Sequence, residues 1–191
     1  SNSGVFANDI TVHTLTVGEG GGSISTNSVL GYQALSSNTT GADNVAIGYQ
    51  ALKANTIGQW NTAVGRGALT SNTTGNFNTA VGRYSLVSNT TGQSNTGFGV
   101  YTLSANTTGS ESTAIGNNAL RNSTGSYNTA IGSAALVTNT TGARNTAMGD
   151  NALQANTTGV DNVAVGSASL FSNVTGINNI AIGRVALYNN T

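Results

Sequence analysis

Residues 61–77 read Asn-Thr-Ala-Val-Gly-Arg-Gly-Ala-Leu-Thr-Ser-Asn-Thr-Thr-Gly-Asn-Phe, and this 17-residue pattern governs almost the whole chain after residue 26. Ten copies are visible, the last cut short at Thr191, and they begin at Asn27, Asn44, Asn61, Asn78, Asn95, Ser112, Asn128, Asn145, Asn162 and Asn179. We number the positions of each unit 1 to 17 from this first residue. A fixed repeat of this kind predicts a stack of similar structural units.

Two glycines and one leucine are the fixed points of the unit. Position 5 is Gly and position 9 is Leu in all ten units, and a second Gly stands at position 15 of each complete unit. Glycine tolerates bends and close backbone approach, so the chain should bend twice per unit. The apolar pairs between the bends, such as Ala63-Val64 and Ala68-Leu69, are too short for ordinary helices. Each coil should therefore hold two short strands, or one strand and a single helical turn at the Ala-Leu pair.

Stacking such coils predicts an all-β fold, a parallel β-solenoid (β-roll) of about ten 17-residue coils. Strand spacing of about 4.8 Å per coil gives a length of roughly 45 to 50 Å. The Asn residues of position 12, from Asn38 onward, should form a ladder of amides, and the neighbouring Thr residues a ladder of hydroxyls. The sixth unit is one residue short, and we place the deletion between Leu120 and Asn122, in a tolerant loop.

The segment before the repeats differs from them. Residues 10–17 alternate in character like a short strand and lead into the glycine-rich residues 18–22. We expect residues 1–22 to be an N-terminal cap or attachment strand with a Gly-rich hinge, and residues 23–191 to form the solenoid. His13 is expected on the strand surface or at an interface.

Composition argues against an enzyme. Charged residues make up 6% of the chain, against about 25% in ordinary soluble domains. With no Cys, one His and six acidic residues, we expect no catalytic site, no cofactor and no metal site. Six basic residues that do not cluster in the sequence predict no nucleic-acid partner, and no apolar run is long enough for membrane insertion.

Apolar side chains on both faces of the strand predict self-association. Neighbouring residues of a strand point to opposite faces, yet positions 3 and 4 are both apolar in nearly every unit, as in Ala80-Val81. A coil that encloses little beyond one Val or Ile and one Leu only narrowly offsets its conformational entropy. Both arguments favour a homo-oligomer, most simply a homotrimeric fibre. The alternative is a monomeric solenoid with an alanine-lined groove.

The Asn-Thr-Ala-Val/Ile-Gly core, seen at residues 61–65, 78–82 and 128–132, resembles the head repeat of trimeric autotransporter adhesins. It is also similar to repeats of phage tail fibres, which often add the continuation seen at residues 65–75. The resemblance covers the repeat region and implies a trimeric, left-handed parallel β-roll that is exposed to the environment and used for attachment. Adhesin head repeats are usually a few residues shorter, so the coil shape can differ here.

The units vary at positions 6, 7, 10, 11, 16 and 17, and the candidate binding residues are taken from positions 6, 7 and 17. They are Trp60, Phe77, Arg66, Arg83, Tyr84 and Tyr101. The two arginines should lie one coil apart, where stacked like charges are unfavourable unless a carboxylate, water or an anionic sugar screens them. The aromatic pairs should stack along one edge, where they suit sugar faces or else fill a groove between chains.

The leading hypothesis is a structural protein of a phage tail fibre or spike, on the virion surface, that mediates or spaces attachment to a host. Its partners would be its own copies, other virion proteins bound through the N-terminal segment, and host surface polysaccharide. A bacterial surface adhesin is the alternative. An ice-binding solenoid is a second one, because of the Thr rows, although we expect the row to break at Ser123 and Val174. A polysaccharide-degrading spike would need paired carboxylates across a cleft. Glu111 should lie two or three coils from Asp150 and Asp161, and the repeat implies no cleft, so we do not favour this function.

Overall fold

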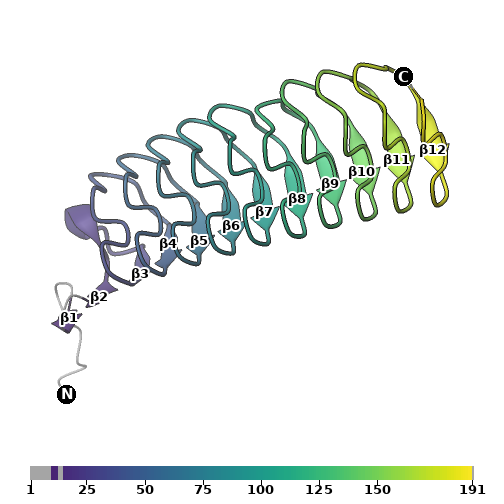
Figure 1. The fold of residues 1–191 in the computed structure, drawn as a ribbon. Coiled ribbons are helices and arrows are strands. Elements are labelled where there is room, and N and C mark those ends of the chain that lie inside the picture. The colour runs from purple at the N-terminus through teal and green to yellow at the C-terminus, as the bar shows by residue number, and fades with distance from the viewer. Residues whose placement is uncertain (1–9, 13–14, 191) are drawn as a thin grey trace.

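The computed structural model describes residues 10–12 and 15–190, which form a solenoid of stacked coils (Figure 1). One sheet runs along its side with its 12 strands in sequence order. Its strands are β1 (Ile10–Val12), β2 (Leu15–Gly18), β3 (Ser28–Leu30), β4 (Val45–Ile47), β5 (Thr62–Val64), β6 (Thr79–Val81), β7 (Thr96–Phe98), β8 (Thr113–Ile115), β9 (Thr129–Ile131), β10 (Thr146–Met148), β11 (Val163–Val165) and β12 (Ile180–Ile182). The predicted all-β parallel solenoid with 17-residue coils is confirmed.

Each coil contributes one strand of three residues, at positions 2 to 4, and β3 to β12 pair in parallel and in register. The Ala-Leu pair of positions 8 and 9 lies in a turn, so it forms neither a second strand nor a helical turn. Hydrogen bonds between coils nevertheless continue beyond the strand. For example, Leu52 N donates to Ala68 O in the following coil, and Gly65 N donates to Ile47 O in the preceding one. Backbone hydrogen bonds therefore join each coil to its neighbours outside the strand as well as within it.

Position 5 ends the strand with a backbone conformation that only glycine adopts readily. Its φ lies between 119° and 150° in all ten coils. A Cβ on Gly65 would also lie 2.7 Å from Gly82 O of the next coil. The position-15 glycines are fixed for the second reason alone, since a Cβ on Gly58 would lie 2.6 Å from Gly75 O. Coils can stack at strand spacing because neither position carries a side chain.

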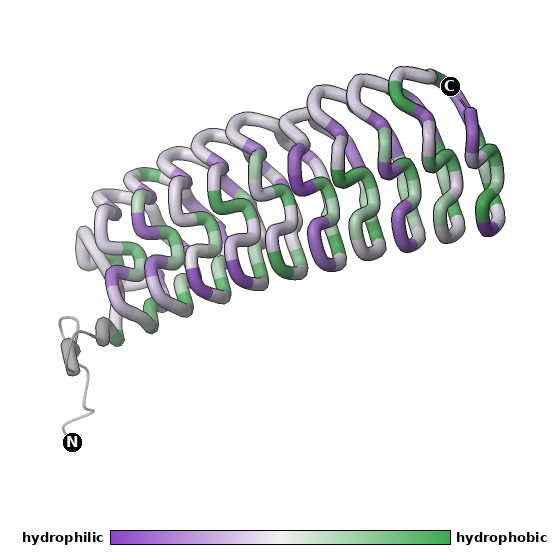
Figure 2. The backbone as a smooth tube through the Cα atoms, in the orientation of Figure 1, coloured by the Kyte–Doolittle hydropathy of each residue, from purple (hydrophilic) through white to green (hydrophobic). Residues whose placement is uncertain are grey.

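The core consists of small and polar side chains around a column of leucines. Ala at positions 3 and 8 and Leu at position 9 are fully buried in the middle coils, as Ala63, Ala68 and Leu69 illustrate. The expectation that Val or Ile fills the interior is wrong, because position 3 points inward and position 4, such as Ile47, points outward. Figure 2 shows the apolar residues recurring at the same places in successive coils.

Each core leucine adopts a left-handed backbone conformation, with φ between 47° and 52°. This conformation costs roughly 1 to 2 kcal/mol for a residue other than glycine. Full burial of a Leu side chain gains about 1.5 to 3 kcal/mol, which offsets that strain. Leu170, which the tenth coil covers, is 0% exposed, whereas Leu187 in that tenth coil is 50% exposed in this structure. Burial of each leucine therefore depends on the next coil.

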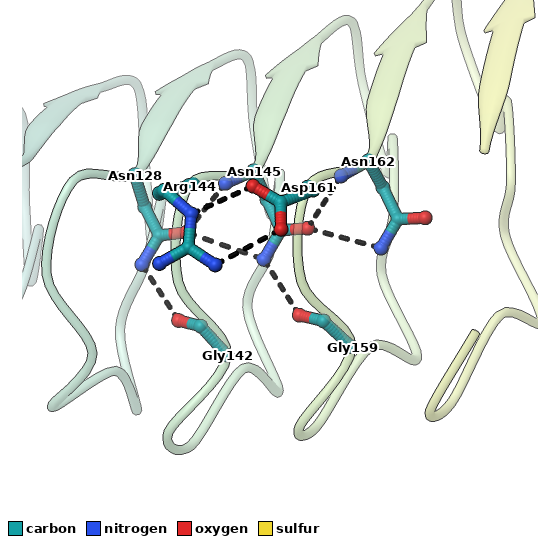
Figure 3. A network of polar contacts seen from close by, with 7 residues as sticks. All are labelled: Asn128, Gly142, Arg144, Asn145, Gly159, Asp161 and Asn162. Atoms are coloured by element: carbon teal, nitrogen blue, oxygen red, sulfur yellow. Dashed lines mark hydrogen bonds and ion pairs between the residues drawn. The ribbon is translucent and has the colours of Figure 1, made fainter. Parts of the chain in front are cut away.

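Two columns of buried asparagines run beside the leucines. The predicted ladder at position 12 is confirmed, with Asn72 Nδ2 donating to Asn55 Oδ1 at 2.9 Å. A second column at position 1 was not predicted: Asn145 donates from its backbone N and from Nδ2 to Asn128 Oδ1, and from Nδ2 to Gly159 O at 2.8 Å (Figure 3). The position-15 carbonyl accepts from both columns, as Gly58 O does from Asn44 and Asn55.

The short sixth coil lacks position 14, so the placement of its deletion between Leu120 and Asn122 is wrong. Leu120, Asn122 and Thr124 keep the pairing of positions 9, 11 and 13. Ser123 occupies position 12, where it accepts from Asn139 Nδ2. A missing residue is tolerated after Thr124 because Thr124 is exposed and lies outside the core. Ser123 has no amide, however, and Asn106 Oδ1 is left buried without a hydrogen-bond partner among the described residues.

The N-terminal end of the sheet is closed by antiparallel strands. β1 pairs with β2, and β2 pairs with β3. The glycine-rich segment lies against the first coil: Gly21 N donates to Leu35 O, Asn38 Nδ2 donates to Gly21 O, and the 3-10 turn η1 spans Gly21–Ser23. Gly21 O thus takes the place of the position-12 amide oxygen that a preceding coil supplies to the asparagine ladder. Residues 1–9, His13 and residue 14 lie outside the described residues.

Gly97 stands at position 3, where most coils have alanine, and the side chains of Ser85 and Thr102 fill the space that the missing Cβ leaves. A Cβ there would collide with Ser85 Oγ and lie 2.8 Å from Thr102 Oγ1. These two buried hydroxyls share a hydrogen bond of 2.7 Å, in place of the alanines found in most coils.

We expect Gly97→Ala alone to lower the free energy of unfolding by about 1 to 3 kcal/mol through overpacking. Combining it with Ser85→Ala and Thr102→Ala should recover most of the loss in denaturant titrations. A single variant as stable as the parent would contradict this account.

The unpartnered Asn106 Oδ1 predicts a stabilising substitution. Ser123→Asn supplies the missing amide donor and should raise the free energy of unfolding by about 1 kcal/mol. The matched control, Asn72→Ser, removes the donor to Asn55 Oδ1 in a coil of normal length and should lower it. Thermal and urea unfolding measure both. A Ser123→Asn protein less stable than the parent would mean that the 16-residue coil has no room for the amide.

Candidate binding surface

The outward positions form three features on a surface without a pocket. Position 4 gives an apolar stripe, position 17 gives a mixed row before the strand, and positions 6, 7 and 10 give a third row after it. Across residues 10–12 and 15–190 the structure has no pocket and no group of His, Cys, Asp or Glu able to hold a metal.

The position-4 side chains are apolar in every coil and run the length of the sheet. Those that are most exposed, at 38% to 72% of their area, are Leu30, Ile47, Phe98, Ile115, Met148 and Ile182. The remaining four, Val64, Val81, Ile131 and Val165, are half-buried. Long exposed apolar surfaces are rare on monomeric proteins and commonly mark contact with a partner.

The structure interleaves the arginines of the third row with tyrosine rings. The Arg66 guanidinium carbon lies 5.4 Å from the centre of the Tyr49 ring and 5.8 Å from that of Tyr84. Arg83 lies 4.9 Å from Tyr84 and 5.9 Å from Tyr101. The expected repulsion between the two arginines is thus moderated by the electron-rich faces of the rings between them. No acidic residue takes part.

Two residues that were not candidates complete this row. Arg121, at position 10, lies 5.4 Å from the Tyr101 ring. Tyr49 and Tyr32 stack on each other at 5.4 Å. Tyr49 occupies the same position as Arg66, a signal present in the sequence. Arg121 also stands at a variable position, position 10, but the repeat pattern does not show that this position meets position 7 of the preceding coil. We call Tyr49, Arg66, Arg83, Tyr84, Tyr101 and Arg121 the Arg–Tyr strip.

Gly67 provides the space for the central ring of the strip. It occupies position 7, one coil before Tyr84, and a Cβ on it would lie 2.6 Å from Tyr84 Cδ1. The Tyr84 ring therefore lies over the glycine backbone and is half-buried, while Arg66 and Arg83 stay exposed. This glycine has a packing role in a single coil, unlike the repeated glycines of positions 5 and 15.

Trp60 and Phe77 form a separate pair on the other side of the strand. Their rings stack at 4.8 Å with planes 4° apart, as predicted, and 49% and 53% of their areas are exposed. No contact of the described residues joins this pair to the Arg–Tyr strip. The six predicted candidates thus form two groups: Trp60 with Phe77, and the two arginines with Tyr84 and Tyr101.

Arg144 and Asp161 form an ion pair further along position 17 (Figure 3). Two hydrogen bonds join them, Nε to Oδ1 at 2.7 Å and an Nη atom to Oδ2 at 2.9 Å. These hydrogen bonds, with the charge of Asp161, raise the pKa of Arg144, and the same hydrogen bonds lower the pKa of Asp161. Both groups lie in water, so the pair contributes little to stability.

The threonines of position 13 form a row that is not interrupted at the sixth coil, where Thr124 fills the position; the expected break at Ser123 is wrong. The break at Val174 is present. Their hydroxyls do not bond to one another. Among the described threonines of the row, all but Thr107 donate to the backbone carbonyl of the next coil, as Thr73 Oγ1 does to Thr90 O. The row thus serves the coil-to-coil hydrogen bonding.

Comparisons with protein-family models, curated proteins and solved structures find no match to this chain. Over the described part of the chain, no helix has the length and apolar character needed to cross a membrane.

Proposed function

We propose that this chain is a structural segment of an attachment fibre, of the kind found in phage tail fibres and spikes, and that it acts on the virion surface as a homotrimer. The observation that carries the proposal is the continuous position-4 stripe along a rigid solenoid. A rod that grows by one coil per repeat suits a spacer, because its length is set by the number of repeats.

The stripe favours copies of the same chain as the partner. It holds no charged or polar side chain in any of the ten coils. A second copy in the same direction places identical residues at the same level, so the coil spacing matches along the whole length. Three stripes that meet on a common axis each contact two others and leave no stripe exposed, which makes the three-fold arrangement closed.

Two alternatives remain open. A bacterial surface adhesin would use the same fibre architecture on a cell rather than on a virion. An ice-binding solenoid is favoured by the regular threonine row, but every described hydroxyl in the row except that of Thr107 donates to a backbone carbonyl, which fixes its single proton. These hydroxyls can therefore accept hydrogen bonds from the water of an ice lattice but cannot donate to it. For this reason we rank ice binding below attachment.

The assembly is tested by native mass. Light scattering of the purified chain should give three times its 19.0 kDa. Ile115→Glu places a charge in the stripe and should yield monomer, because burying an unpaired carboxylate is costly. Ile57→Glu, at an exposed residue of position 14, is the matched control and should remain trimeric. A monomeric parent chain would sink the trimeric fibre.

The location is tested by labelling. Antibodies raised against the chain should decorate fibres of purified phage particles in electron micrographs of the source culture. If the antibodies label the bacterial surface and leave the phage particles unlabelled, the chain belongs to an adhesin. If neither surface is labelled and the chain lowers the freezing point of ice below its melting point in a nanolitre osmometer, the ice-binding function would replace both the fibre and the adhesin.

A further inference from the structure

We propose that the Arg–Tyr strip binds an acidic polysaccharide, laid along the solenoid axis with its carboxylates on Arg66, Arg83 and Arg121 and its sugar rings against the tyrosines. The proposal deepens the attachment function above and rests on it for its biological role. The binding itself depends only on the strip.

Charge in this neutral chain is segregated by the fold. Residues 44–127, which are coils two to six, contain four basic residues and one acidic residue, a net charge of +3. The basic ones are Lys53, Arg66, Arg83 and Arg121, all at position 6 or 10. The acidic one, Glu111, is at position 17 and precedes its strand. In these five coils the row after the strand therefore carries positive charge alone.

The arginines keep their hydrogen-bonding edges available. None of Arg66, Arg83 and Arg121 forms an ion pair with a described residue, whereas Arg144 is occupied by Asp161. A guanidinium that meets a ring with its face leaves its N–H groups in the plane free to donate to a carboxylate, often as a bidentate pair. The rings hold each arginine in place before binding, so less entropy is lost when the ligand arrives.

The dimensions suit an extended glycan. Arg66 and Arg83 lie in successive coils, about 4.8 Å apart at strand spacing, and the strip from Tyr49 to Arg121 spans four such steps, roughly 20 Å. One sugar of an extended chain advances by a length close to one coil. Acidic groups recurring along such a polymer can therefore meet the arginines in register, while the exposed Tyr49 and the half-buried Tyr84 and Tyr101 add apolar contact area beside them.

An acidic glycan fits this surface better than a nucleic acid. Nucleic-acid binding relies on many Lys or Arg contacts to phosphates, and the strip offers three arginines on a chain with zero net charge. The tyrosines are also engaged with arginines rather than presented as free platforms for successive bases. Single-stranded DNA is therefore the competing polyanion that the experiment must include.

The test measures binding of the intact chain to alginate oligosaccharides by calorimetry, beside neutral dextran and oligodeoxythymidine. Arg66→Gln with Arg83→Gln and Arg121→Gln should weaken alginate binding at least tenfold. Arg144→Gln with Arg184→Gln, the matched control outside the strip, should leave it unchanged. Tyr84→Leu with Tyr101→Leu keeps every charge and should weaken binding several-fold, because the rings orient the arginines. All variants are compared at equal native mass.

Each contrary result overturns the proposal in a distinct way. Absence of alginate binding, or binding that the arginine variant retains, removes the site. Oligodeoxythymidine bound as tightly as alginate, with the tyrosine variant unaffected, reduces the strip to a nonselective positive surface. A change of native mass in the strip variants assigns these residues to packing between chains. Failure here leaves the fibre intact, because its assembly and location are measured by scattering and labelling.

Discussion

The hydrogen bonds that run from coil to coil along one axis are the interaction on which this fold depends. They join backbone groups around most of the coil, and inside it they join asparagine to asparagine, so that Asn72 is satisfied by Asn55 before it and satisfies Asn89 after it. A buried amide without its partner costs about 1 to 3 kcal/mol. Every coil must therefore offer the same polar groups at the same place, which explains why the 17-residue period is kept so strictly. Ser123 shows the consequence of an exception, in the unpartnered oxygen of Asn106.

Stacking also makes an otherwise strained coil stable. Positions 9 and 17, and position 7 in every coil but one, hold residues other than glycine in the left-handed region. A single coil would have no means to offset this strain, since it encloses one leucine and a few small residues. The next coil supplies the cover, as the contrast between Leu170 and Leu187 shows. The same strained turns bring positions 6, 7 and 10 together on the surface, so the geometry that buries the leucine also assembles the Arg–Tyr strip.

Much of this architecture could be predicted from the sequence because the repeat identifies equivalent residues. Period, parallel stacking, the ladder at Asn38 and its successors, and the stacking of Trp60 on Phe77 all follow from placing equal positions above one another. What periodicity does not contain is the direction of a side chain within the coil. Periodicity favours a Val or Ile as the interior residue, yet in β5 Ala63 is buried and Val64 is only half-buried. Nor does it identify Asn61 as a member of a second ladder. Arg121 was missed for the same reason, since its contact with Tyr101 joins different positions through a turn that no repeat pattern specifies.

Because the interior is committed to stacking, only the outward positions are free to acquire function, and the fold sorts them by position. An apolar residue repeated at position 4 becomes a continuous stripe whatever its identity, and another copy of the chain has the same period, which is why we propose a copy as the partner. The Arg–Tyr strip is different, because its residues change from coil to coil and occupy coils two to six only. A linear ligand can follow such a strip and engage several weak sites at once, so that the first contact raises the effective concentration of the ligand at the next. The binding that we propose needs no cavity, because weak contacts in successive coils add up to a site as long as the strip.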